Sequence, residues 1–118
     1  MPVSWVEHRG QNILYVDYSG LGKVECLALL QEHAAALDAS QGLVLTLVNA
    51  KGAVLGSEFL HAASAAAPRN TRRTMRRATV GAEGFAMEML EFFNLRTGPA
   101  PMRAFETFDE ALTYLTEP

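Results

Sequence analysis

Six apolar or β-branched residues, LVLTLV, follow one another without interruption at positions 43–48. A strand with one face in water alternates apolar and polar residues, whereas an unbroken run is typical of a strand covered on both faces. The run therefore predicts the central strand of an α/β sheet. It leads into a loop at residues 49–56 and a helix expected over residues 58–67. Because open α/β sheets bind ligands at the carboxyl ends of their strands, we expect any functional site in this loop.

The residues around this loop form a candidate interaction site. Ser57 stands where an N-cap residue belongs, and Glu58 suits the positive end of the helix dipole. Ser57 has two open interpretations, an ordinary cap, which we favour, and a phosphoacceptor that regulates binding. His61 does not make a nucleophile pair with Ser57, because no third group is placed to orient the imidazole. The candidate set is Asn49, Lys51, Gly52, Gly56, Ser57 and Glu58, with Asp17 at the rim of the preceding strand.

The first part of the chain predicts a hairpin followed by a helix. Short β-rich runs at residues 3–8 and 13–18 are separated by a glycine-containing link and pair as antiparallel strands. A helix expected over residues 23–38 carries two adjoining apolar stripes. Since this arc is wider than one sheet face covers, the helix packs either beside another helix or against a second subunit. The stripes are Leu27, Leu30, Ala34 and Leu37, and Cys26, Leu29, His33 and Ala36.

The second part continues the alternation of strands and helices. Pro68 is expected to end the second helix, because the residue before a proline is disfavoured in the helical region. A strand follows over residues 78–81, then a third helix over 83–96 closed by Gly98 and Pro99. A strand at 101–105 precedes a last helix that begins with a capping box of Thr107 and Glu110. The third helix also has a wide apolar arc, made of Phe85, Ala86, Met89, Leu90, Phe92 and Phe93.

This order of elements predicts one α/β domain over residues 1–118, with the order ββαβαβαβα. After the hairpin each strand alternates with a helix, which calls for a mixed, mostly parallel sheet of five strands with right-handed crossovers and four helices. A chain of 118 residues is close to the commonest domain size. A second domain is not expected.

Composition argues against several classes of function. Ten Lys and Arg against 13 Asp and Glu give a net charge of −3, which argues against a general nucleic-acid binder. The single cysteine, Cys26, excludes a disulfide framework, suits a reducing cytosol and is expected to be a buried apolar thiol. His8 and His33 are expected at the surface and helix flank, since no histidine pair has metal-binding spacing. We expect no metal, cofactor, secretion signal or membrane span.

A run of arginines is the second polar feature of the sequence. It could bind phosphate groups or an acidic partner, but a solvated connection paired with acidic residues is favoured. The run has no aromatic residue for base stacking, which argues further against nucleic acid. Because it precedes a strand, we expect it at the end of the sheet opposite the 49–56 loop, so that the two features do not share one site. The arginines are Arg69, Arg72, Arg73, Arg76 and Arg77.

Trp5 in the first strand, YVDY at 15–18, a central strand ending in Asn49, and FETFDEAL at 105–112 accompany this order of elements. Together they resemble the small STAS-like (STAS/SEC14-like) proteins of the SpoIIAA-like superfamily. Better-known STAS relatives, the anti-sigma-factor antagonists, carry an aspartate at the end of the central strand and a serine at the next helix start, which a partner kinase phosphorylates. The resemblance implies this role for Ser57 only. Asn49 replaces the aspartate, and Glu58 would repel a phosphate on Ser57.

Two functions follow as expectations. The first is a non-enzymatic regulatory STAS-like module, a cytoplasmic homodimer that contacts an unidentified protein partner through residues 49–58. The alternative is binding or sensing of an apolar small molecule or lipid between the sheet and the first or third helix. An enzyme is expected least, because Asp17, Asn49, Lys51 and Ser57 have no evident mutual arrangement for acid–base work.

Overall fold

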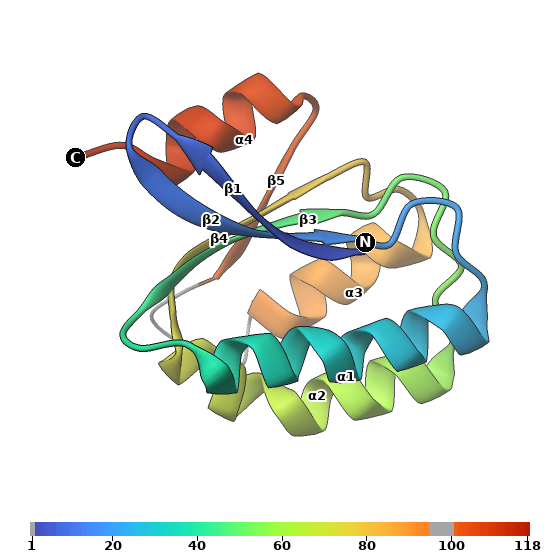
Figure 1. Cartoon of the computed structure of the whole chain (residues 1–118). Helices are drawn as coiled ribbons and strands as arrows, with labels where there is room; N and C mark the ends of the chain where they lie inside the picture. The colour runs from blue at the N-terminus through green and yellow to red at the C-terminus, as the bar shows by residue number, and fades with distance from the viewer. Residues whose placement is uncertain (1, 95–100) are drawn as a thin grey trace.

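The computed structural model describes residues 2–94 and 101–118, and at residues 85, 92 and 93 it describes the backbone. Within these ranges strands and helices alternate after an opening hairpin (Figure 1), which confirms the predicted order and the α/β class. The elements are β1 (Val3–His8), β2 (Gln11–Asp17), α1 (Lys23–Ala39), β3 (Val44–Asn49), α2 (Ser57–Arg72), β4 (Thr74–Val80), α3 (Phe85–Asn94), β5 (Met102–Phe105) and α4 (Phe108–Leu115).

The strands form one sheet in the order β1-β2-β3-β4-β5. β1 is antiparallel to β2, and the other neighbouring strands are parallel. The apolar run from Val44 onward lies in the central strand, where every residue of β3 before Asn49 is buried. An unbroken apolar strand is stable there because helices cover both faces of the sheet. Leu43 precedes the strand and is exposed.

The helices divide unequally between the two faces. α1, α2 and α3 lie on one face and α4 on the other (Figure 1). Successive residues of a strand point to opposite faces, so β2 and β3 supply two cores. One contains Leu14 and Val48 together with Cys26 of α1, and the other contains Ile13 and Leu47 together with Leu115 of α4. Both stripes of α1 contribute buried residues to this arrangement.

β4 contains a bulge at Met75. Val44 pairs with Thr74, but the next residue of β3, Leu45, pairs with Arg76, so that Met75 is the extra residue. A bulge leaves one residue unpaired and shifts the alternation of side chains beyond it. The bulge at Met75 therefore determines which of the following residues of β4 point to each face of the sheet.

The shifted alternation sends two consecutive arginines to opposite faces. The guanidinium of Arg76 donates to the carbonyl oxygen of Tyr114 at 3.0 Å, and Ala78 lies in the core under α4. Arg77 and Thr79 line a cavity on the face covered by α1, α2 and α3. Arg76 and Arg77 are thus not part of a solvated connection before the strand, because β4 begins at Thr74 and includes both. The other three arginines of the run, Arg69, Arg72 and Arg73, do precede the strand and are exposed.

Pro68 does not end α2, which continues to Arg72. The last turn is held by contacts outside the helix. Arg69 forms an ion pair with Asp38 of α1, with its Nε 3.1 Å from Oδ1. Asn70 is buried, and its carbonyl oxygen accepts a hydrogen bond from Thr74 Oγ1 at 2.8 Å. These tertiary contacts outweigh the local preference of the residue before proline.

The capping box of α4 is confirmed. Thr107 Oγ1 accepts from the Glu110 N–H at 3.2 Å, and the Glu110 carboxylate accepts from the Thr107 N–H at 3.2 Å. The predicted stop of the third helix at Gly98 and Pro99 lies outside the described residues, as do the phenylalanine side chains of its apolar arc. In residues 2–94 and 101–118 no helix is long and apolar enough to cross a membrane.

Candidate functional site

The 49–56 loop lies at the carboxyl edge of the sheet and is tied to the loops on both sides. The Gly20 N–H donates to the Lys51 carbonyl oxygen at 3.0 Å, and the Ala50 N–H donates to the Val80 carbonyl oxygen at 2.8 Å. The loop is therefore a fixed part of the rim, because its backbone bonds join it to the segments that follow β2 and β4.

Asp17 and Asn49 pair in register at this rim, but both use their side chains locally. Asp17 Oδ1 accepts from the N–H and the hydroxyl of Ser19, at 3.0 and 2.5 Å. Asn49 donates to the hydroxyl of Tyr15 at 3.2 Å and accepts from the Lys51 N–H at 3.1 Å. These bonds shape the turns that follow β2 and β3.

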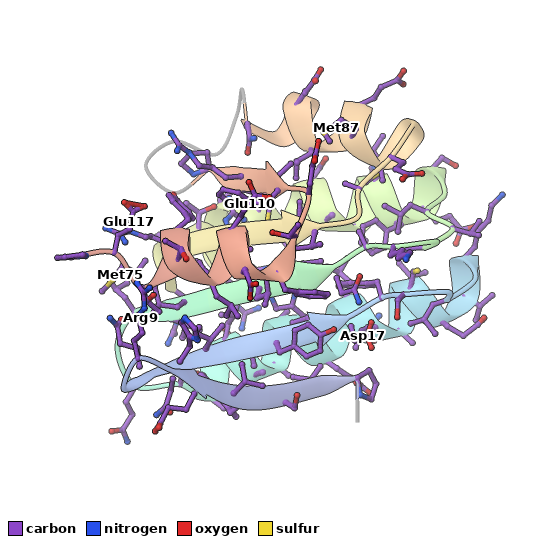
Figure 2. All side chains as sticks on the ribbon, turned by 90° about the horizontal axis from the view of Figure 1, so that it is seen from above. Arg9, Asp17, Met75, Met87, Glu110 and Glu117 are labelled. Atoms are coloured by element: carbon purple, nitrogen blue, oxygen red, sulfur yellow. The ribbon has the colours of Figure 1, made fainter. Side chains whose placement is uncertain are left out.

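The rim residues also lie on the face of α4. Tyr15, which holds the Asn49 side chain, packs edge-on against Phe108 of α4 with ring centroids 6.2 Å apart. Figure 2 shows Asp17 at one end of the sheet and Met75 at the other. Asp17 and Asn49 are thus separated by the sheet from the cavity that Arg77 lines.

Ser57 is not the N-cap of α2. The cap is Gly56, whose carbonyl oxygen accepts from the Leu60 N–H at 3.0 Å, and no side chain caps the helix. A Cβ atom at Gly56 would lie 3.2 Å from Cδ of Lys23, so the lysine side chain packs closely against this turn. Ser57 is the first helical residue, and it is exposed together with Glu58.

A cavity of about 130 Å³ lies between the sheet and helices α1, α2 and α3. Its walls are mostly apolar, and three alanines, Ala63, Ala67 and Ala86, leave space where larger side chains would fill it. Other apolar wall residues include Leu30, Val48, Leu55, Phe59, Met89, Leu90 and Met102.

The described walls of the cavity differ in exposure. The wall residues contributed by α1 and β3, Leu30 and Val48, are buried. The facing wall residues of α2 and α3 are half-buried, namely Ala63, Ala67, Ala86 and Leu90.

Three polar side chains line the cavity near the amino ends of the strands. His33 and Asn70 are 7% and 8% exposed, and Arg77 is half-buried. Arg77 pairs with Thr46 near the start of β3, and Asn70 lies in the last turn of α2. The loop residues that line the cavity, such as Leu55, lie beyond the carboxyl ends, where Tyr18 also lines it. The charged and unpartnered groups are thus at the amino end of the cavity, and the carboxyl end is uncharged.

The amino end of the cavity contains buried polar atoms without hydrogen-bond partners among the described residues, and it carries the positive charge of Arg77. His33 Nε2 and Asn70 Oδ1 are buried and have no hydrogen-bond partner among the residues that the structure describes. Burial, and then the charge of Arg77, lower the pKa of His33 from 6.5 to about 4, so its imidazole is neutral at pH 7. Burial also lowers the pKa of Arg77, which as a guanidinium remains protonated.

One prediction about these residues is wrong. His33 is buried and does not lie at the surface, because the second stripe of α1 faces the sheet. Arg77 does lie toward the end of the sheet opposite the loop, as expected. Leu55 of the loop lines the same cavity from the other end, but none of the candidate loop residues lines it, namely Asn49, Lys51, Gly52, Gly56, Ser57 and Glu58. The sequence did carry a signal, because Ala63, Ala67 and Asn70 recur at helical spacing on one face of α2.

The thiol of Cys26 lies apart from the charged end of the cavity, and the possible metal ligands among the described residues do not cluster. Cys26 is buried as predicted, and burial raises the pKa of its thiol. Across the described part of the chain, no three side chains of His, Cys, Asp or Glu come together in a way that could hold a metal ion.

Comparison with known proteins identifies the fold. No family model and no curated protein matches the chain. Among solved structures it is similar to an uncharacterized protein of the DUF3478 family with a SpoIIAA-like fold from Shewanella loihica PV-4. The TM-score is 0.73 at 16% sequence identity, over 96% of this chain and 91% of that chain. The fold is therefore SpoIIAA-like, as the resemblance implied.

Proposed function

We propose that this domain is a non-enzymatic binding module that holds a small apolar molecule in the cavity between the sheet and helices α1, α2 and α3. The cavity itself, with a volume of about 130 Å³ and mostly apolar walls, carries the proposal. Protein interiors are close-packed and contain few voids larger than a water molecule. An engineered apolar cavity of about 150 Å³ binds benzene, so a space of this size is sufficient for one small ring.

The proposal is tested by an NMR titration of the protein with toluene, observed through the methyl groups of Met89 and Met102, which line the cavity. We expect saturable shifts of both methyl signals. Ala63→Leu fills the cavity from α2 and should abolish these shifts. Ala65→Leu adds the same side chain at an exposed position of the same helix and should leave the titration unchanged.

Two results would contradict ligand binding. Methyl signals that stay in place at saturating toluene would mean that the cavity does not accept an apolar molecule. Equal titrations of wild type and Ala63→Leu would place the probe elsewhere on the protein.

A second candidate is regulated binding of a protein partner at the start of α2. The exposed position of Ser57, whose hydroxyl caps no helix, favours it. A phosphate there would meet free backbone amides, although Glu58 opposes it by like charge. Ser57→Glu should change the set of proteins recovered from a cell extract relative to Ser57→Ala, with both variants folded. Recovery of identical sets would count against this candidate.

A further inference from the structure

The two unpartnered polar atoms of the cavity limit what can fill it. His33 Nε2 and Asn70 Oδ1 have no hydrogen-bond partner among the described residues, and each side chain is more than nine-tenths buried. Leaving a buried polar group unsatisfied is unfavourable, so an occupant that bonds to it binds better than a purely apolar one. A hydrocarbon would satisfy neither atom.

The charge at this end favours an anion. Arg77 has five N–H donors in a planar fork, which allows it to bind a further acceptor besides its contacts within the protein. His33, neutral at pH 7, can carry its proton on Nε2 and donate it. None of the described residues that line the cavity is acidic, so an entering anion meets no like charge.

We infer that the ligand is a small monocarboxylate with an apolar body, held with its carboxylate at Arg77, His33 and Asn70 and its body toward Leu55 and Phe59; this inference rests on the proposed function. The two carboxylate oxygens accept from the guanidinium and from His33 Nε2–H. The Asn70 amide, turned about its last torsion, donates its N–H₂ group to the same head group.

The volume sets the size of the apolar body. At about 130 Å³ the cavity is below the roughly 300–1,000 Å³ of drug-sized sites and close to one that holds a single benzene ring. The ligand class is therefore aromatic or branched short-chain acids. A long fatty acid is too large to be fully buried in this cavity.

The test compares two probes of similar size, benzoate and benzyl alcohol, by isothermal titration calorimetry at pH 7. Both carry the same ring, and only benzoate carries a charge. We expect wild type to bind benzoate at least about tenfold more tightly than benzyl alcohol, as for a charge-assisted hydrogen bond. Arg77→Gln should remove this preference and leave the affinity for benzyl alcohol within about twofold.

Arg76→Gln is the matched control. It removes the same charge from the neighbouring position, whose side chain faces α4, and should leave both affinities unchanged. Equal affinity of wild type for the two probes would overturn the carboxylate while leaving the cavity as a binding site. Failure of both probes and of toluene would instead remove the proposed function. If Arg77→Gln does not fold, the wild-type ratio of the two affinities decides the question without it.

Discussion

A neutral imidazole is the state that the surroundings of His33 select. Its pKa falls from 6.5 to about 4 because the ring is buried and faces the charge of Arg77. The unfolded chain takes up this proton near pH 6.5, whereas the folded protein does so only near pH 4. Since the unfolded state binds more protons between these values, His33 lowers the stability as the pH falls through this window, and it has no such effect above it.

We predict that this residue removes about 3 kcal/mol from the free energy of unfolding between pH 7 and pH 4. Urea denaturation of wild type and His33→Gln across this range measures the difference, because the variant lacks the titrating group. His61→Gln, at an exposed position, serves as the control and should keep the wild-type dependence. The same pH dependence in wild type and His33→Gln would contradict the prediction.

Single residues were predictable where their chemistry sufficed. Cys26 and His33 lie on one stripe of α1 and both are buried, but only the burial of Cys26 was predicted. A thiol behaves as a small apolar group wherever it lies. Whether an imidazole is buried depends on the side chains that surround it in the fold. Asn70 and Arg77, which line the cavity together with His33, lie far from it along the chain.

At the scale of single elements, the starts of α2 and α4 differ in what caps them. Gly56 caps α2 through its backbone, whereas Thr107 and Glu110 cap α4 with side chains. A capping side chain contributes about 1 kcal/mol, and an exposed serine one position inside a helix contributes little.

We therefore expect Thr107→Ala to lower the free energy of unfolding by about 1 kcal/mol, and Ser57→Ala to change it by less than about 0.5 kcal/mol. Guanidinium denaturation of the two variants measures both values, and each substitution serves as the control for the other. A loss at Ser57 as large as that at Thr107 would mean that the serine hydroxyl supports the helix after all.

The capping box was predictable because its partners are three residues apart, so the local sequence contains the whole interaction. The end of α2 was not predictable from the local sequence. Arg69 and Asn70 are held by contacts with α1 and β4, and the conformational preference of the residue before Pro68 takes no account of such contacts. The start of β4 was missed for a related reason. Arg76 and Arg77 resemble a solvated run in sequence, while the folded sheet places them on opposite faces.

In the whole molecule, segments distant in sequence meet at the carboxyl edge of the sheet. Gly81 follows β4 with φ +84°, and a Cβ atom added to it would lie 2.8 Å from Cβ and 2.9 Å from the backbone N of Lys51. Only glycine combines this backbone conformation with so close an approach. The contact helps to fix the loop after β4 against the loop after β3.

We expect Gly81→Ala to lower the free energy of unfolding by about 2 kcal/mol or more, since it adds steric overlap to backbone strain. Gly10→Ala is the matched control, because Gly10 has φ +76° and no atom within 4 Å of an added Cβ atom. It should cost only the strain, about 1 kcal/mol. Thermal denaturation compares the two variants, and equal losses would show that the approach to Lys51 relaxes without cost.

The fold was predictable at this scale because each element has its own pattern and the alternation of strands and helices leaves few topologies. The cavity was not, since three helices and the sheet must first be placed against one another. The wide apolar arc of α1, which suggested a second subunit, is largely covered within the chain by the sheet and α2. The homodimer stays a prediction, and sedimentation equilibrium tests it.

The bulge at Met75 has a consequence for comparing this chain with its relatives. In a strand that alternated regularly from Thr74, Arg76 would face the cavity and Arg77 would face α4. An alignment that deletes or inserts one residue at position 75 therefore exchanges the roles of the two arginines. In homologous sequences the cationic residue of the cavity must be located by counting back from Val80 at the carboxyl end of the strand.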